Sequence, residues 1–363
     1  MPSVVIAVPD LDRTACLHKL RTRAGLTLEP GPTHTGSQQA ATAIQEYRQM
    51  KRRTFITGAG MLAAAAATAP FAARLAQAQV PFSSGTEPPR LKAPAHACDS
   101  HMHIYDSRFP VAATATLRPP DAHVSDYRLL QKRIGTTRNV IVTPSTYGTD
   151  NSCTSDALRQ IGPSARGVAV VDTRVTDAEL KRLSDDGFRG IRFNLVQAGA
   201  TTVEMIEPLS KRVNDLGWHV QIHMTADQIV KSADLLERLP SAIVLDHLGR
   251  IPEPAGVSHP AFTLILKLID KGRTWVKLSG AYQDTKVGPP TYADSSALAR
   301  AYVKAAPQRL VWGTDWPHPT EKNNKPDDAI LFDLLDQWAP EDSTKNRILV
   351  TNPEELYGFD KAA

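Results

Sequence analysis

From about residue 97 onward, short apolar runs rich in β-branched residues alternate with longer amphipathic stretches. Apolar runs of four to eight residues bounded by turn residues are typical of buried strands. The pattern predicts eight strands, which we place at Ala97–His103, Asn139–Pro144, Gly167–Val171, Gly190–Asn194, His219–His223, Ala242–Asp246, Trp275–Ser279 and Leu310–Gly313.

Between most of these strands, apolar residues recur with the spacing of a helix packed on a sheet. The predicted helices are Thr176–Asp186, Val203–Leu216, Asp227–Arg238, Phe262–Lys271 and Tyr292–Ala306. Strands that alternate with helices predict an α/β fold, and eight of them predict a (β/α)8 TIM barrel. A doubly wound sheet is the alternative, but it usually shows a glycine-rich phosphate turn after its first strand, which is lacking here.

The segment before the barrel has the three parts of an export signal. Residues 51–57 (KRRTFIT) form a twin-arginine run, Gly58–Phe71 is apolar and alanine-rich, and Ala76–Ala78 offers a small-x-small cleavage site. Such an arrangement is typical of a secretory signal, and the paired arginines resemble the bacterial twin-arginine (Tat) signal. We therefore expect residues 50–78 to be read by the Tat export machinery and the mature protein to be periplasmic.

A signal peptide normally begins at the N-terminus, so we interpret residues 1–49 as an upstream extension from a spurious start. Residues 79–94 are then a linker, and residues 95–363 are the barrel domain. The alternatives for the signal are a basic, alanine-rich helix or one membrane span. The apolar stretch is short for a span, so we expect no stable membrane insertion.

Composition narrows the class of protein further. The chain has 363 residues, 42% hydrophobic and 22% charged, with a net charge of +4. This balance excludes a disordered chain, a collagen and a coiled coil, and the small net charge does not suggest nucleic-acid binding. Three cysteines cannot build a disulfide framework. Cys98 and Cys153 could pair in an oxidising periplasm or remain separate buried thiols, and the oligomeric state stays open.

Chemically capable side chains gather at the C-terminal ends of the predicted strands. His101 and His103 end the first strand on one face, His223 ends the fifth, His247 follows the sixth and Asp315 follows the eighth. TIM-barrel enzymes place their catalytic groups at these ends. The five groups would suit one divalent metal ion, such as zinc or manganese, or a metal-free electrophilic site.

Two arginines and two hydroxyl residues are candidates for binding a substrate. Arg192 and Arg250 follow strands, and a guanidinium matches a carboxylate through two hydrogen bonds. Each could instead pair with a carboxylate of the barrel. Ser145 and Tyr147 follow the second strand and could bind a substrate oxygen or close their loop.

Four further residues have weaker claims. Tyr105 and Tyr282 are aromatic residues at the rim, and His318 is either structural or a support for the site. His219 begins its strand, so it should point to the opposite, stabilising end of the barrel.

The chain resembles the amidohydrolase superfamily from Ala95 to Tyr357, in the branch of 2-pyrone-4,6-dicarboxylate lactonase, sulfomuconolactone hydrolase and galactarolactone isomerase. The resemblance is carried by the motifs DSHMH (99–103), RGIRFN (189–194), LDHLGR (245–250) and VWGTDWPHP (311–319). It implies that Asp315 is the general base toward water. It also implies that His101, His103 and His247 polarise a lactone carbonyl, by hydrogen bonds or through a bound metal.

Two departures from that branch bear on the metal and the substrate. The pyrone-dicarboxylate enzymes have a tyrosine where this chain has His223, which would complete a mononuclear site with Asp315. The fourth strand ends at Asn194, not at the bridging lysine of two-metal members. No second basic residue follows in Leu195–Gln197, which weakens the assignment of a dicarboxylate.

We therefore predict a hydrolase that opens the ring of a small anionic lactone carrying a carboxylate. The alternatives are a metal-dependent non-oxidative decarboxylase of the same superfamily and a non-catalytic periplasmic binding protein. Asp315 speaks against a binding protein, since a carboxylate beside the scissile carbon does not help to bind an anion. It also favours hydrolysis over isomerisation, because the isomerase branch lacks the strand-eight carboxylate. The missing lysine makes an amidase or phosphotriesterase-like activity the weaker choice.

Overall fold

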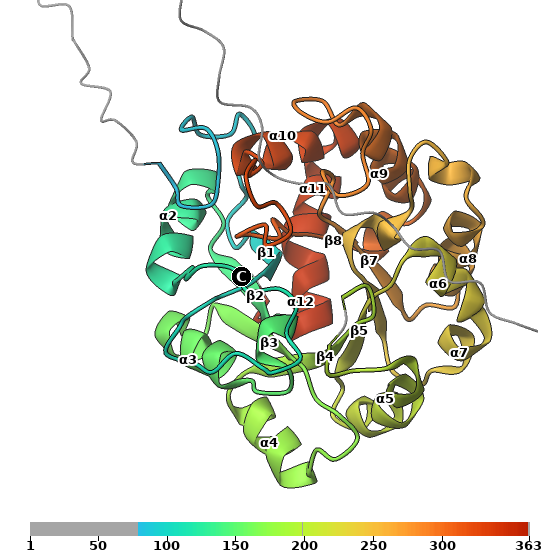
Figure 1. The fold of residues 1–363 in the computed structure, drawn as a ribbon. Coiled ribbons are helices and arrows are strands. Elements are labelled where there is room, and N and C mark those ends of the chain that lie inside the picture. Colours follow the sequence, from blue (N-terminus) through green and yellow to red (C-terminus); the bar gives the residue numbers. More distant parts are fainter. Residues whose placement is uncertain (1–78, 198, 362–363) are drawn as a thin grey trace, which may run out of the picture. The chain divides into compact units, whose positions relative to one another are not determined.

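The structure, a computed structural model, describes residues 79–197 and 199–361. Eight parallel strands follow one another in chain order around a barrel (Figure 1). They are β1 (Cys98–Met102), β2 (Arg138–Val142), β3 (Ala165–Ala169), β4 (Phe188–Asn194), β5 (His219–His223), β6 (Ile243–Leu245), β7 (Thr274–Leu278) and β8 (Leu310–Trp312). The prediction of a TIM barrel is confirmed, and each predicted strand overlaps an observed one.

Helices surround the strands on the outside of the barrel, except the last one, Asn352–Tyr357, which packs against the barrel interior at its N-terminal end (Figure 1). They are α2 (Val124–Ile134), α3 (Ser152–Ile161), α4 (Asp177–Asp185), α5 (Ile206–Asn214), α6 (Ala226–Lys231), α7 (Ala233–Arg238), α8 (Pro260–Asp270), α9 (Ala293–Ala305), α10 (Asp328–Trp338), α11 (Asp342–Asn346) and α12 (Asn352–Tyr357). The helix predicted at Asp227–Arg238 is two helices that meet at Ser232. The sequence pattern had not singled out α2, α3, α10, α11 or α12.

The strands are buried on both faces, which explains their nearly continuous apolar sequences. All five residues of β2 (RNVIV) and of β7 (TWVKL) are buried. A parallel sheet covered by helices on one side and by its own interior on the other has no solvent-facing side chains to alternate with. The lysine within β7 is therefore an exception that needs a local explanation.

The barrel closes where the segment after β8 meets β1. Met102 pairs with Trp316 as an isolated bridge, and the backbone N–H of His103 donates to the carbonyl of Trp316 at 2.8 Å. Gly313 makes this approach possible, because a Cβ there would lie 2.7 Å from the backbone nitrogen of His101. The first and last strands, more than two hundred residues apart, are thereby held side by side.

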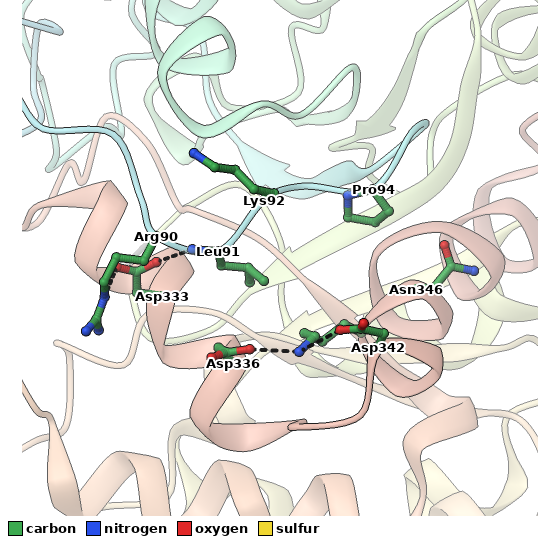
Figure 2. A pocket seen from close by; sticks show the side chains of 9 residues that line it. Arg90, Leu91, Lys92, Pro94, Asp333, Asp336, Asp342 and Asn346 are labelled. Carbon is green, nitrogen blue, oxygen red and sulfur yellow. Dashed lines mark hydrogen bonds and ion pairs between the residues drawn. The ribbon is translucent and has the colours of Figure 1, made fainter.

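The segment predicted as a linker packs on the barrel domain. The carboxylate of Asp333 in α10 accepts from the backbone N–H of Leu91 at 2.8 Å and from Nε of Arg90 at 3.1 Å. These residues border a surface pocket with Lys345, which bridges Asp336 and Asp342 (Figure 2). The indole of Trp316 also donates to the carbonyl of Pro81 at 2.8 Å.

Two questions that the sequence left open concern cysteines and membranes. Cys98 and Cys153 are separate, buried, free thiols, and burial raises the pKa of each to about 12. Within the described ranges, no helix combines the length and the apolar character needed to cross a membrane. The predicted extension (1–49) and signal peptide (50–78) lie outside the described residues.

His219 lies at the N-terminal end of β5, away from the catalytic ends of the strands, as the sequence predicted. It is buried over Gly190 and packs edge-on against Tyr357 of α12, with ring centroids 5.4 Å apart. Burial lowers the pKa of His219 to about 3. The folded chain therefore resists protonation of this ring at pH values where the unfolded chain accepts it.

We predict that this histidine makes the fold acid-sensitive. Between about pH 6.5 and pH 3 the unfolded state binds a proton at His219 that the native state does not bind, so the free energy of unfolding falls as the pH falls, by about 5 kcal/mol in full. Urea unfolding over this range should show a shallower pH dependence for His219→Gln than for the wild type. The exposed His96→Gln is the control, and an equal slope in all three proteins would contradict the prediction.

Candidate active site

Four side chains meet at the C-terminal mouth of the barrel. His101 and His103 come from the end of β1, His247 follows β6, and Asp315 follows β8. The Nε2 atoms of His103, His101 and His247 lie 3.3, 3.5 and 3.9 Å from Oδ1 of Asp315. All four residues are buried. The fold thus brings together, at the C-terminal ends of three strands, residues that are far apart in the chain.

The backbone at this mouth is strained. His247, Arg250, Asp315 and His318 have φ values of 50°, 50°, 65° and 54°. Non-glycine residues in this left-handed region cost of order 1–3 kcal/mol each and gather at functional sites. Asp99 helps to hold the strand-eight segment, because its carboxylate accepts from N–H and Oγ1 of Thr314 at 2.9 and 2.7 Å. The positive φ values therefore lower the stability of the fold, and in return they direct these side chains toward the mouth of the barrel.

Each imidazole is fixed by a partner at its other nitrogen. Nδ1 of His103 lies 2.7 Å from the carbonyl of Val142, and Nδ1 of His247 lies 2.9 Å from Oγ of Ser279. Nδ1 of His101 faces Asp246 at 3.3 Å and Lys277 at 3.2 Å. In all three, Nε2 is left directed at Asp315, and partners of this kind orient histidines that bind metals.

Burial also sets the charges of the cluster. It lowers the pKa of His247 to about 4, and burial together with Lys277 holds the pKa of His101 well below its usual value. Burial thus disfavours the charged form of both rings. Burial opposes charge on Asp315, yet the facing imidazoles, His247 foremost, hold the pKa of this carboxyl well below its usual range.

The donor atoms fit one divalent cation. A carbonyl only accepts, so Nδ1 of His103 carries a proton and a neutral His103 presents a lone pair at Nε2 to Oδ1 of Asp315. Acceptor atoms 3.3 Å apart require a proton or a cation between them. Nitrogen and carboxylate ligands suit zinc or manganese. Among the described residues, two such groups form, His101–His103–Asp315 and His101–Asp246–His247.

His223 borders the cluster but belongs to neither group. Its Nε2 accepts from Nη1 of Arg250 at 2.9 Å, and its Nδ1 faces Nη2 of Arg192 at 3.4 Å. Its ring centroid lies 5.1 Å from that of His247. A guanidinium only donates, so the lone pair of His223 is engaged by Arg250 in this structure.

The two predicted substrate arginines pair with acids of the protein. Nε of Arg192 donates to Asp246 at 3.1 Å in the buried interior. Arg250 forms a two-pronged pair with Asp284, at 2.7 and 3.0 Å. The sequence had left this structural role open beside substrate binding. Arg250 is the more accessible of the two side chains, 17% exposed against 4%.

The hydroxyl candidates lie on a short turn after β2, Ser145–Tyr147. The hydroxyl of Tyr147 accepts from the backbone N–H of Asp106 at 2.8 Å and donates to the carbonyl of the same residue at 3.2 Å. Tyr147 is buried and closes the loop, whereas Ser145 is half-buried. Tyr105 is buried beside His103.

Sequence reasoning missed the polar support below the cluster. Lys277 of β7 is fully buried and donates to the carbonyl of Ser100 and to Oε1 of Gln221, both at 2.8 Å. Burial lowers the pKa of Lys277 to about 8. Burial opposes charge on Asp246, but His101, Arg192 and Lys277 hold its pKa well below its usual range. A lysine inside an apolar strand was the available signal.

The other oxygen of Asp315 has its own donors. Oδ2 accepts from the hydroxyl of Tyr282 at 2.6 Å and from the amide of Gln283 at 2.9 Å. The sequence marks Tyr282 only as an aromatic residue at the rim and gives no signal for Gln283. Both lie in the loop after β7, where no periodic pattern exists to mark them.

Fold and site together define a hydrolase of the TIM-barrel type, with its acid and imidazoles at the C-terminal mouth. The chain belongs to the amidohydrolase family, because residues 98–359 match the family model described as Amidohydrolase.

Individual relatives cover most of the chain. The 2-pyrone-4,6-dicarboxylate hydrolase of Comamonas testosteroni is 36% identical over 281 residues, which are 74% of this chain and 92% of that protein. The 4-sulfomuconolactone hydrolase of Rhizobium radiobacter is 33% identical over 293 residues, 78% of this chain and 98% of that protein. An apo crystal structure from Agrobacterium tumefaciens superimposes with a TM-score of 0.73 at 29% identity, covering 77% of this chain and 99% of that one.

Proposed function

We propose that this enzyme hydrolyses the ester bond of a small anionic lactone that carries a carboxylate. The observation that carries the proposal is the position of Asp315, whose Oδ1 lies within 3.9 Å of three imidazole Nε2 atoms. A buried base beside groups that can polarise a carbonyl is what ester hydrolysis by water requires. The named activities of the two hydrolase relatives support the same class of substrate.

In the proposed reaction, Oδ1 of Asp315 takes a proton from the attacking water. The water oxygen adds to the lactone carbonyl, and negative charge develops on the carbonyl oxygen. The ester C–O bond then breaks, and the proton held by Asp315 passes to the ring oxygen that leaves. The product is an open-chain acid with a new hydroxyl or keto group.

The imidazoles can stabilise the developing charge in two ways, through a proton carried at Nε2 or through a divalent ion that their Nε2 lone pairs would hold. His101, His103, His247 and Asp315 are the residues that would bind it. When bound, such an ion supplies Lewis-acid polarisation of the carbonyl. Without an ion, a proton on Nε2 of His103 would satisfy Asp315 and could donate to the carbonyl oxygen.

We predict that Asp315→Asn lowers kcat/KM by about 10²- to 10⁴-fold, because the amide cannot take the proton of water. Muconolactones, pyrone carboxylates and sugar lactones should be assayed by acid release. Asp333→Asn, on the surface of α10, is the control for a lost carboxylate. Undiminished hydrolysis by Asp315→Asn would contradict the assigned base. Release of carbon dioxide would indicate a decarboxylase, and conversion without acid release would indicate an isomerase.

We also predict that the purified protein holds about one equivalent of zinc or manganese, and that His103→Ala lowers this content. Elemental analysis before and after treatment with a chelator measures both. His219→Gln, at the opposite end of the barrel, should keep the wild-type metal content. Full activity in metal-free protein would contradict a role for the metal in the reaction, and a protonated imidazole would then be the group that polarises the carbonyl.

We further propose that residues 50–78 direct export through the Tat machinery. The support is the arginine pair before an apolar stretch and a small-residue cleavage site. Expressed in a bacterium with a Tat system, the protein should be recovered from the periplasm, and changing Arg52 and Arg53 to lysine should retain it in the cytoplasm. Equal periplasmic recovery of both forms would contradict this assignment.

A further inference from the structure

A chain of hydrogen-bonded polar groups leads away from the outer oxygen of Asp315, from the half-buried Tyr282 into the interior. The hydroxyl of Tyr282 donates to Oδ2 of Asp315 at 2.6 Å, and the same hydroxyl lies 3.1 Å from Nδ1 of His318. Nε2 of His318 lies 3.1 Å from Oδ2 of Asp328, the first residue of α10. His318 and Asp328 are fully buried. Neither touches the imidazole cluster through its side chain.

The direction of the hydrogen bonds along this chain is restricted. The Tyr282 hydroxyl has one proton and two possible acceptors, Asp315 and the ring of His318. It is free for Asp315 only when Nδ1 of His318 carries a proton and itself donates to the tyrosine oxygen. The contact between Nε2 of His318 and Asp328 then needs a further proton, which the carboxylate and the ring share.

In the opposite arrangement the hydroxyl turns to His318. Asp315 Oδ2 would then keep only the amide of Gln283, at 2.9 Å. The backbone resists other rearrangements, because N–H of His318 donates to the carbonyl of Asp315 at 2.8 Å and Lys325 donates to the carbonyl of His318 at 2.7 Å. The orientation of one hydroxyl is therefore the variable that Asp328 can control.

We propose that His318 and Asp328 are positioning residues for the reaction. Together they keep the Tyr282 hydroxyl turned toward Oδ2 of Asp315, and this bond holds Oδ1 toward the imidazoles and the attacking water. Oδ1 of Asp315 thus takes part in the reaction, whereas the hydrogen bonds to Oδ2 fix the orientation of the carboxylate. The inference rests on the proposed function, since it assigns these residues a role through the base Asp315.

A double-mutant cycle tests whether Asp328 acts through the hydroxyl of Tyr282. Tyr282→Phe should lower kcat by about 10-fold or more with little change in KM, because it removes a hydrogen bond to the charged base. Asp328→Asn should lower kcat several-fold in the wild type and should have no further effect in Tyr282→Phe. Equal losses in both backgrounds would overturn the proposal, since a merely structural role is additive. If Asp328→Asn does not fold, His318→Gln completes the same cycle.

A second measurement reads the hydroxyl without substrate. In protein labelled with carbon-13 at the phenol carbon of tyrosine, the resonance of Tyr282 is identified by its loss in Tyr282→Phe. Asp328→Asn should shift this resonance, and an unshifted resonance would overturn the proposal. Asp333→Asn is the matched control, because it changes a carboxylate on the same helix that binds Arg90 and Leu91 at the surface (Figure 2). It should alter neither kcat nor the resonance.

The two measurements separate this proposal from the proposed function. If no lactone is hydrolysed, or if Asp315→Asn keeps its activity, the proposed function fails while the resonance still reports on the chain. If the wild type is active and Asp315→Asn is not, additive losses in the cycle overturn the positioning role alone.

Discussion

The candidate active site depends on the contact that closes the barrel between β1 and the segment after β8. The N–H of Asp315 donates to the carbonyl of His101, and the N–H of His103 donates to the carbonyl of Trp316, both at 2.8 Å. Gly313 leaves the space for this approach. These backbone bonds place the acid beside the two histidines of β1 before any side-chain interaction is considered. A change that separated the two strands would therefore dismantle the candidate site even if every side chain of the cluster were kept.

The second constraint is electrostatic, because the cluster is buried and water cannot screen it. A buried charge is tolerated only with partners of fixed geometry. Asp246 has Arg192 at 3.1 Å and Lys277 at 3.8 Å, and Lys277 in turn is held by two carbonyl oxygens. This interior network also fixes Nδ1 of His101. The lysine in β7 and the acid before His247 thus support the mouth from below, which explains polar residues inside strands that are otherwise apolar.

The spacing of apolar residues in the sequence predicted the repeating strands and helices of this structure, and little of what lies in the loops. The strands and the group formed by His101, His103, His247 and Asp315 followed from apolar runs and from the rule that barrel chemistry lies at strand ends. The pairing of Arg250 with Asp284, and the chain from Tyr282 to Asp328, could not be predicted. They join loops to a helix start across distances that no local pattern encodes. His223 ends a strand as predicted, but its Nε2 accepts a hydrogen bond from Arg250, and Asp284 in the loop after β7 holds that arginine in place.

The pairing of both arginines has a consequence for the substrate. Arg192 is committed to Asp246 in the interior, and Arg250 is shared between Asp284 and His223. A substrate carboxylate would therefore have to join or displace an acid already present, and Arg250 is the more accessible place for it to do so. An anion with two carboxylates would need a second such exchange. The uncharged residues after Asn194 likewise weaken the assignment of a dicarboxylate, so the arginine pairing supports the proposed substrate, a lactone that carries a carboxylate, without requiring a second one.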